Sequence, residues 1–147
     1  GNALAQRNLG LMYEEGEGVD YDAEEAARWF RLAAEQGDVV AQTHLGQFLW
    51  MGRGPIPRDR RAGLALLKQA ARQDHAHAQY LYCANRTELH GQGADALVDA
   101  FMWCKLAADQ GYPGGEQMWE AAEHWFLSAG QKQRAAELAD EWRQRHR

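Results

Sequence analysis

Residues 33–37 read Ala-Ala-Glu-Gln-Gly, residues 70–74 read Ala-Ala-Arg-Gln-Asp, and residues 107–111 read Ala-Ala-Asp-Gln-Gly. These phrases follow one another at a constant step of 37 residues. Self-similarity at a fixed period of this length is typical of a protein built from stacked repeats. The step therefore predicts a repeat architecture, in which a binding surface is more usual than a catalytic pocket.

Each unit carries apolar and small residues at helical spacing in two separate stretches. In the first unit, Ala5, Leu9 and Tyr13 mark one stretch, and Ala26 and Phe30 mark the other. Residues three or four positions apart share one face of a helix, so each unit is expected to form two amphipathic helices, A and B. The predicted fold is all-α: an α-solenoid of about three and a half helix-turn-helix repeats and a C-terminal capping helix.

The joints between these helices contain residues suited to ending and starting them. Gly16 and Gly18 can adopt the positive φ found at a helix C-terminus. Asp22 is placed to cap the next helix, with Glu25 three residues later completing a capping box, and Asp59 repeats the cap in the second unit.

A small residue recurs where helices A and B are expected to meet, at Gly10, Gly46 and Cys83. A small residue lets helices A and B pack more closely, and this packing offsets the cost of glycine in a helix, about 1 kcal/mol. Cys83 and Cys104 fall on the two helices of the third unit, so one disulfide is possible. Buried free thiols are the preferred interpretation, because cysteine is often simply a small core residue.

The period slips in two places. Pro55 and Pro57 stiffen a loop with one extra residue, and the third unit has two extra residues before Gly91 and only Asp95 as a substitute cap. After Gly111 the pattern fades, and residues 131–145 are expected to form a polar last helix. The predicted repeats are residues 1–36, 37–73 and 74–110, with a degenerate repeat and cap over residues 111–147.

Charge is unevenly distributed along the chain, whose net charge is -5. Residues 1–38 hold three basic and nine acidic side chains, and residues 39–73 hold six basic and one acidic. The overall balance gives no reason to expect nucleic acid as a partner. There is no apolar run long enough for a transmembrane helix. Gly1 aligns with Gly37, so we expect a piece cut at a repeat boundary, with the compartment, cytoplasmic or periplasmic, left open.

The repeat pattern resembles the Sel1-like repeat, a relative of the tetratricopeptide repeat. The second unit departs from the family pattern at Leu49 and Leu66, and the third departs at Cys83 and Arg86. The resemblance covers residues 1 to about 127. The first unit matches throughout, at Ala5, Leu9, Gly10, Tyr13, Gly16, Gly18, Val19, Asp22, Ala26, Trp29, Phe30, Ala33, Ala34 and Gly37.

The resemblance implies right-handed superhelices that serve as adaptors, scaffolds or partner-binding modules, mostly in bacteria. Some family members are immunity proteins that neutralise a secreted toxin or lipase. We therefore expect a non-catalytic module that binds a protein or peptide and needs no cofactor. An immunity protein, or a structural spacer within a longer solenoid, is the alternative function.

Catalytic and metal-binding patterns are weak in this chain. Ser128, which is its only serine, lies at an expected helix end and is interpreted as a polar terminus group. His75 and His77, with His90 further on, are the best metal candidates, although an i, i+2 pair diverges on a helix. Residues 14–22 faintly resemble a calcium loop but lack the order of acidic ligands that an EF-hand requires.

A partner is expected on the concave face, which the A helices of tandem repeats line. Trp50 is the preferred anchor, because its equivalent in the first unit is Glu14 and the repeat demands no apolar group there. Packing of Trp50 under the proline loop is the alternative, and Tyr80 is a second anchor. The predicted contact residues are Arg7, Leu11, Glu14, Thr43, Gln47, Trp50, Tyr80, Thr87 and Gln117.

A basic rim is expected beside this face, formed by Arg53, Arg58, Arg60 and Arg61. Two of these arginines stand at a helix N-terminus, where a cation is mildly unfavourable. The rim could contact an acidic partner or anionic head groups, or it could be a solvated surface paired with the acidic first repeat.

Overall fold

The computed structural model describes residues 1–87 and 93–147, apart from the side chains of Thr87 and Glu123. Across these residues the secondary structure is helical, without strands. The helices are α1 (Ala3–Glu15), α2 (Ala23–Glu35), α3 (Val39–Met51), α4 (Arg60–Ala71), α5 (Ala76–Thr87), α6 (Ala94–Asp109), α7 (Pro113–Trp125) and α8 (Ala129–Arg145).

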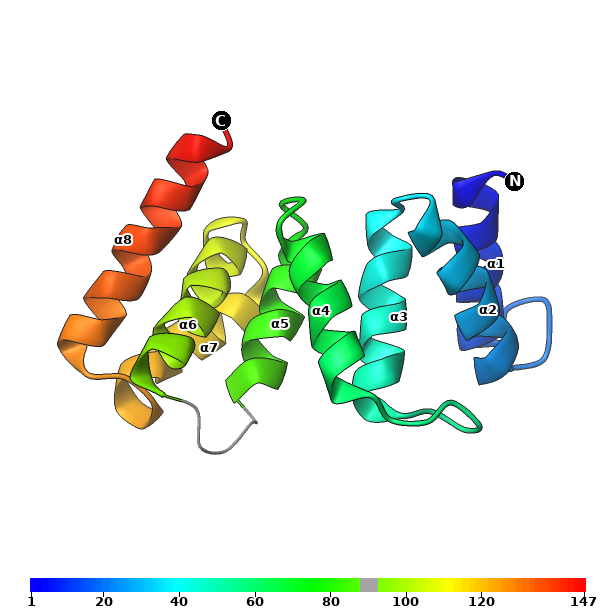
Figure 1. Ribbon diagram of the computed structural model, residues 1–147, viewed down its shortest axis with the longest axis horizontal. Helices are drawn as coiled ribbons and strands as arrows, with labels where there is room; N and C mark the ends of the chain where they lie inside the picture. The colour runs from blue at the N-terminus through cyan, green and yellow to red at the C-terminus, as the bar shows by residue number, and fades with distance from the viewer. Residues whose placement is uncertain (88–92) are drawn as a thin grey trace. The chain divides into compact units, whose positions relative to one another are not determined.

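The chain forms two compact units, Gly1–Gln73 with α1–α4 and Asp74–Arg147 with α5–α8. Within the first unit, α1 with α2 and α3 with α4 form antiparallel hairpins (Figure 1). In the second unit, α5 packs against α6, and α6 also packs against α7 and α8. The prediction of paired helices in each repeat is confirmed.

Helix starts in the first unit follow the predicted aspartate caps. The Asp22 carboxylate accepts hydrogen bonds from the backbone N–H groups of Glu24 and Glu25, both at 3.0 Å. Asp59 accepts one from Ala62 N–H at 3.0 Å. The reciprocal half of the capping box was predicted wrongly: the side chain of Glu25 instead pairs with Arg28 at 3.3 Å.

Glycine ends helices at the predicted positions. Gly16 and Gly18 have φ values of 69° and 75°, in the left-handed region that glycine adopts without strain. The third repeat starts its second helix differently from the prediction. Gly93 is the N-cap of α6 and has no side chain to cap it, while Asp95 lies in the first turn.

The final helix begins two residues earlier than predicted. Ser128 caps α8, and its side chain and that of Gln131 exchange hydrogen bonds with each other's backbone N–H groups at 3.3 and 2.8 Å. The interpretation of Ser128 as a helix-terminus group is confirmed. Gly130 falls inside the first turn of α8 and does not break the helix.

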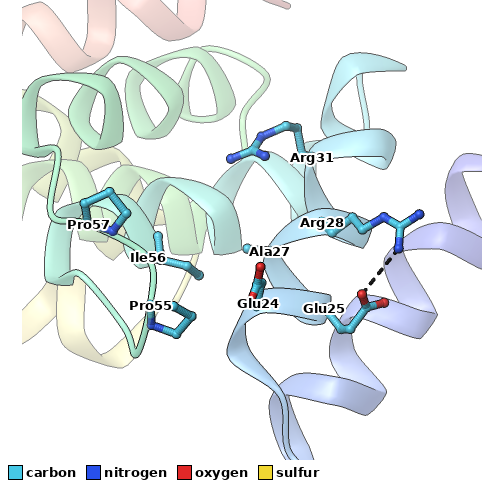
Figure 2. Close-up of a pocket in the computed structure, with 8 residues that line it drawn as sticks. All are labelled: Glu24, Glu25, Ala27, Arg28, Arg31, Pro55, Ile56 and Pro57. Atoms are coloured by element: carbon cyan, nitrogen blue, oxygen red, sulfur yellow. Dashed lines mark hydrogen bonds and ion pairs between the residues drawn. The ribbon is translucent and has the colours of Figure 1, made fainter.

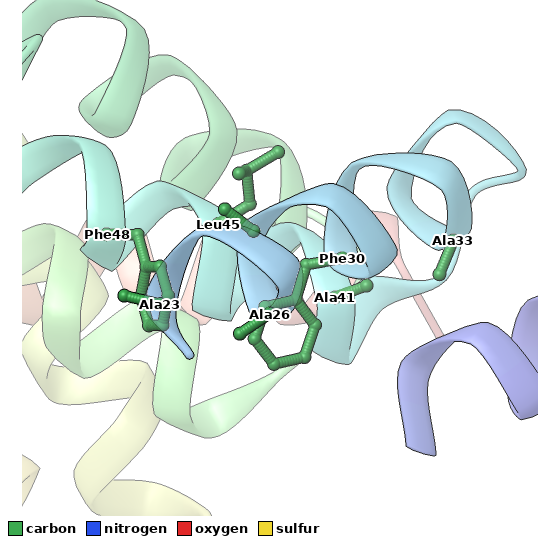
Figure 3. Packing of buried hydrophobic residues seen from close by; sticks show 8 residues of the cluster. Ala23, Ala26, Phe30, Ala33, Ala41, Leu45 and Phe48 are labelled. Carbon is green, nitrogen blue, oxygen red and sulfur yellow. The ribbon is translucent and has the colours of Figure 1, made fainter. Parts of the chain in front are cut away.

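Close contact between helices A and B explains the recurring glycine in the first unit. A Cβ atom on Gly10 would lie 2.6 Å from the ring of Phe30, and one on Gly46 would lie 2.9 Å from Leu67 Cγ. Phe30 is fully buried, next to Phe48 in the core cluster (Figure 3). The large residue on helix B thus occupies the space left by glycine on helix A.

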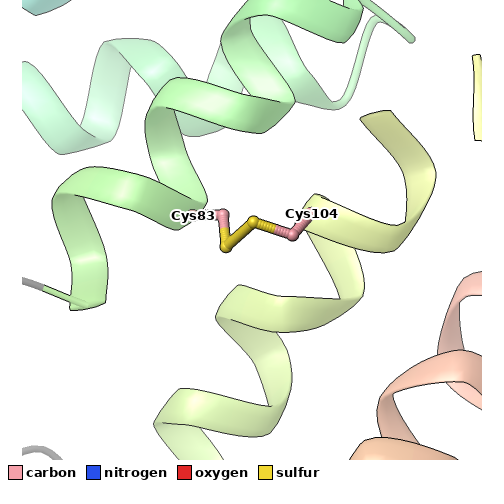
Figure 4. The surroundings of a disulfide bond; sticks show 2 residues. All are labelled: Cys83 and Cys104. Atoms are coloured by element: carbon pink, nitrogen blue, oxygen red, sulfur yellow. A yellow bond between two sulfur atoms is a disulfide. The ribbon is translucent and has the colours of Figure 1, made fainter. Parts of the chain in front are cut away.

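In the second unit, a disulfide occupies the equivalent contact. Cys83 on α5 and Cys104 on α6 are both fully buried and are joined, with their Cα atoms 5.6 Å apart (Figure 4). The preferred interpretation of free thiols was therefore wrong. Cys83 aligns with Gly10 and Cys104 with Phe30, so a covalent bond replaces the glycine-to-aromatic contact.

Paired glutamines also join helices A and B in each repeat. Gln73 donates to Gln42 at 2.8 Å, and Gln110 donates to Gln79 at 2.9 Å. The pair in the first repeat joins Gln36 and Gln6. Because Gln42 and Gln79 are buried, these hydrogen bonds satisfy side-chain amides that would otherwise be costly to desolvate.

Candidate peptide-binding groove

Two hollows share Arg31 on α2 in the first unit. We call them together the α2 groove. The first encloses about 420 Å³ and is lined by Glu24, Glu25, Ala27, Arg28, Arg31, Pro55, Ile56 and Pro57. The second encloses about 460 Å³ and is lined by Arg31, Ala34, Glu35, Leu45, Leu49, Leu66 and Gln69. Both volumes lie in the range of sites that hold small ligands or peptide side chains.

The proline loop, which contains the extra residue of the second repeat, forms one wall of the first hollow. Residues 55–57 lie opposite α2, with the side chain of Ile56 directed toward Ala27 (Figure 2). The loop is fixed at both ends, because Ile56 N–H donates to Arg53 C=O at 2.9 Å and Asp59 N–H donates to Leu49 C=O at 2.8 Å. The two prolines restrict it further.

The second hollow lies where the second repeat departs from its family pattern. Leu49 stands where the first repeat has Tyr13, and Leu66 stands where it has Trp29. Both leucines line the hollow. A leucine side chain is smaller than that of tyrosine or tryptophan, so the two departures leave space on this side of the unit.

Charged side chains of α2 border this apolar lining. Glu25 and Arg28 pair with each other on the side away from the proline loop, while Glu24 and Arg31 extend toward it (Figure 2). Among the described residues, no hydrogen bond or ion pair engages the side chains of Glu24, Arg31 or Glu35. These three charges are therefore available to a ligand.

Trp50, the preferred anchor of the sequence analysis, is buried, with 4% of its surface exposed. An exposed anchor at Trp50 is therefore contradicted, and a packing role, the alternative given for this residue, agrees with its burial. Its backbone lies against Gly63, where an added Cβ would be 2.8 Å from Trp50 N, and the Arg60 guanidinium lies over its ring at 4.8 Å. Gly63 replaces the alanine of the other repeats, at Ala26 and Ala100, and permits this close approach.

Other predicted contact residues of the first unit also serve the fold. Thr43 is fully buried and donates its hydroxyl to Val39 C=O at 2.8 Å. Arg7 pairs with Asp38 at 3.3 Å, and Leu11 packs against the core. An exposed contact at Thr43 is therefore excluded, whereas Arg7 and Leu11 are only half-buried, and contact of these two with a partner stays a prediction.

Glu14 is also held from two sides. Its carboxylate lies 2.7 Å from His44 Nδ1, an ion pair when the imidazole is protonated, and 3.4 Å from Arg53 Nη1. Arg53 therefore pairs with the acidic first repeat, which was the alternative to a partner contact for the basic rim. Its guanidinium also lies 4.8 Å from the Phe48 ring centre.

The remaining rim arginines are exposed. Arg58 donates to Met51 C=O at 3.4 Å, Arg60 stacks on Trp50, and Arg61 is exposed at the start of α4. These three retain solvent-facing positive charge. A contact between this rim and an acidic partner stays a prediction.

The other predicted contact residues are at least partly exposed where their side chains are described. Gln47 is half-buried and donates to Met51 Sδ at 3.4 Å, and Gln117 is exposed on α7. Tyr80 is half-buried and lies 5.2 Å from the Tyr112 ring. Thr87 lies outside the described side chains.

Tyr112 lies beside Tyr80 and stacks on His77 at 5.6 Å between ring centres. Burial raises the pKa of Tyr112 above the ordinary value of 10.0, and the charge that Tyr80 would carry when ionised raises it further. The two tyrosines thus form an aromatic cluster at the N-terminal end of α7.

The metal candidates have no supporting geometry in the described part of the chain. Among the described residues, no group of three or more histidine, cysteine, aspartate or glutamate side chains is arranged to hold a metal ion. This result covers the calcium-loop candidate at residues 14–22. His75 and His77 lie 6.2 Å apart between ring centres, and His90 falls outside the described residues. Within the same described residues, no helix is both long and apolar enough to span a bilayer.

The α2 groove was not predicted, because a partner was expected on the A helices and α2 is the B helix of the first repeat. The signals were present in the second repeat: the prolines of the loop and the two leucines at aromatic positions. Together, these residues show that one side of the second repeat differs from the same side of the first repeat.

Comparison with known proteins gives the following matches. The Sel1 repeat family model matches residues 3–38, 39–75 and 76–112. A Sel1 repeat protein from Oxalobacter formigenes shares 29% identity and a TM-score of 0.70 over 83% of this chain and 48% of its own. The protein c5321, a protective antigen of uropathogenic Escherichia coli with an SLR fold, shares 25% identity and a TM-score of 0.79 over 92% of this chain and 29% of its own.

A sel1-like repeat-containing protein of Acanthamoeba polyphaga mimivirus, L21, is 43% identical over 49 residues, or 33% of this chain. The chain spans 9% of that relative and less than half of either solved structure. Together with the helical structure, these matches confirm the predicted all-α fold class of Sel1-like repeats.

Proposed function

Since this chain belongs to the Sel1 repeat family, whose repeats are generally protein-interaction modules, we propose that it is a non-catalytic adaptor or scaffold that binds a peptide segment of a partner protein. We place the peptide in the α2 groove. The observation that carries this placement is the coincidence of both hollows with the departures of the second repeat. Residues 55–57, Leu49 and Leu66 line them, and each departs from the first repeat.

The groove has the composition of a recognition site. Apolar side chains supply the area whose burial drives binding, and a few charged groups at the edge fix orientation. The predicted concave-face residues contribute less to this proposal, since Trp50 and Thr43 are buried and Glu14 is paired. Gln47 in the first unit, and Tyr80 and Gln117 in the second, remain individual candidates for further contacts.

The test uses a variant that fills the second hollow with residues the repeat itself uses. Leu49→Tyr with Leu66→Trp restores the family residues, so the hairpin should fold while the hollow closes. A random peptide library displayed on phage is panned against the immobilised chain. Enriched peptides are then synthesised with a fluorescent label and titrated by anisotropy.

We expect enriched peptides to bind the double variant at least tenfold more weakly than the original chain, as an order of magnitude for losing a buried anchor. Arg72→Glu, an exposed change directly after the end of α4 and outside both hollows, is the matched control and should bind normally. Circular dichroism checks that each variant folds. Equal affinity for the filled variant would place binding elsewhere, and a library that yields no enriched peptide would contradict the adaptor function.

A further inference from the structure

The charges available in the α2 groove follow a fixed order along one helix. Glu24, Arg31 and Glu35 line the hollows, and in the described residues their side chains have no hydrogen-bond or ion-pair partner. Glu25 and Arg28 neutralise each other at 3.3 Å. The groove therefore presents negative, positive and negative charge in sequence along α2.

The spacing of these charges follows from helix geometry. At 1.5 Å per residue, Glu24 and Arg31 are separated by roughly 10 Å along the axis, and Arg31 and Glu35 by about 6 Å. An extended peptide advances about 3.3 Å per residue. Matching charges on such a peptide are therefore about two residues from the centre on one side, where both side chains share a face, and about three on the other, where the side chain must turn back toward α2.

We propose that the occupant of the α2 groove is an extended peptide segment with a central carboxylate, flanked by basic residues about three and two positions away, and with apolar residues between them. The carboxylate pairs with Arg31, and the basic residues pair with Glu24 and Glu35. The apolar residues contact Ile56 in one hollow and the leucines of the other. This inference rests on the proposed peptide-binding function and specifies its ligand.

The physical role of the charges is selection more than tight binding. Exposed ion pairs contribute little each, because water and salt screen them. A peptide with the opposite order would instead place three like-charge pairs along α2, and repulsion of this kind discriminates strongly between partners. The order of charges thus decides which apolar segments enter the groove.

The experiment exchanges the charges of both partners. Labelled peptides contain KLVDLK, which has the proposed order, or ELVKLE, which has the opposite order, and each is also made with its sequence reversed because either chain direction is possible. They are titrated by anisotropy at low salt against the original chain and against the triple variant Glu24→Lys, Arg31→Glu, Glu35→Lys. Arg72→Glu again serves as the control.

We expect the original chain and the control to bind KLVDLK, in one direction, at least tenfold more tightly than ELVKLE. The triple variant should reverse this preference. The same preference in both proteins, no preference in either, or no binding of any peptide would overturn the proposed ligand. Thermal melting confirms that the triple variant is folded.

Failure here differs from failure of the proposed function. If library peptides lose affinity in the filled variant but show no charge order, the groove binds peptides and only the ligand is wrong. If filling the second hollow has no effect on their affinity, the proposed site is wrong as well. A second copy of this chain as occupant would appear as a dimer, in sedimentation analysis, that the filled variant abolishes, and it would overturn the peptide ligand.

Discussion

Gly10 and Phe30 show how one residue pair sets the distance between two helices. The ring of Phe30 occupies the place that a side chain on Gly10 would need, and Leu67 does the same beside Gly46. In the third repeat the same two positions hold Cys83 and Cys104. The three residue pairs therefore occupy the same contact between helices A and B in different repeats.

Gly10→Ala should destabilise the first unit by about 1–3 kcal/mol, because the new Cβ would overlap the Phe30 ring and overpacking has costs of this size. Gly130→Ala is the matched control. A Cβ there meets nothing within 4 Å, and alanine favours helix, so stability should stay equal or rise slightly. Urea unfolding measures both, and equal losses would contradict the packing argument.

Removing the disulfide by Cys83→Ser and Cys104→Ser should cost about 3 kcal/mol, the usual loss for a loop of this size. Cys83→Gly with Cys104→Leu recreates the contact that Gly46 and Leu67 make, so it should recover part of that loss. Urea unfolding with and without dithiothreitol tests this. The free energy of unfolding of the original chain should fall in reductant, whereas that of either variant should not change.

Tyr112 should make stability sensitive to alkaline pH. Burial raises its pKa in the folded chain above 10.0, so the neutral phenol is favoured by folding. That contribution is complete below the unfolded pKa and is lost as the pH rises through the folded pKa. Tyr112→Phe should therefore lose less stability than the original chain between about pH 9 and 11, whereas Tyr21→Phe, at an exposed site, should follow the original chain.

At the scale of elements, α2 has two roles. Its buried face carries Phe30 and the alanines of the core, and its other face borders the α2 groove. Asp22 supplies the side-chain cap of the helix, because Glu25 is engaged with Arg28 and does not return the hydrogen bond of a capping box. The cap therefore supports both the buried face of α2 and the face that borders the groove.

Asp22→Ala should cost about 1 kcal/mol, as the loss of an N-cap does. Glu25→Ala should cost only a few tenths, since it removes an exposed i, i+3 pair. Thermal unfolding of the two variants gives the ranking, and a larger loss for Glu25→Ala would indicate a complete capping box.

Element positions were predictable because local chemistry decides them. The glycines at positive φ, the aspartate caps and the helical spacing of apolar residues each act within one turn of the chain. The fate of Trp50 was not predictable from its own repeat alignment. The backbone of Trp50 packs against Gly63 on another helix, a contact that the alignment of one helix with its equivalents does not include. Predicting the disulfide similarly required knowing that Gly10 contacts Phe30, because Cys83 and Cys104 occupy the equivalent positions.

At the scale of the whole molecule, the two units differ in how they are stabilised. The first unit, Gly1–Gln73, relies on packing, and its described part contains the α2 groove. The second unit, Asp74–Arg147, contains the disulfide, and Asp109 of α6 pairs with Arg143 of α8. Reduction should therefore act on the two units unequally.

Hydrogen exchange followed by mass spectrometry should localise this difference. In reductant, we expect faster exchange in α5 and α6 and little change in α1–α4, because only the second unit loses a covalent constraint. The serine double variant should reproduce the pattern without reductant. Uniform acceleration along the chain would show instead that both units unfold as one cooperative element.

The contact between helices A and B also limits the order in which sequences can change. Enlarging the glycine first forces atoms into an aromatic ring, whereas shrinking the aromatic first leaves a void that the structure tolerates at a cost. A lineage moving from a glycine–phenylalanine pair to a cystine therefore loses the ring before it gains the second thiol. The position equivalent to Cys104 is the one where such a history would begin.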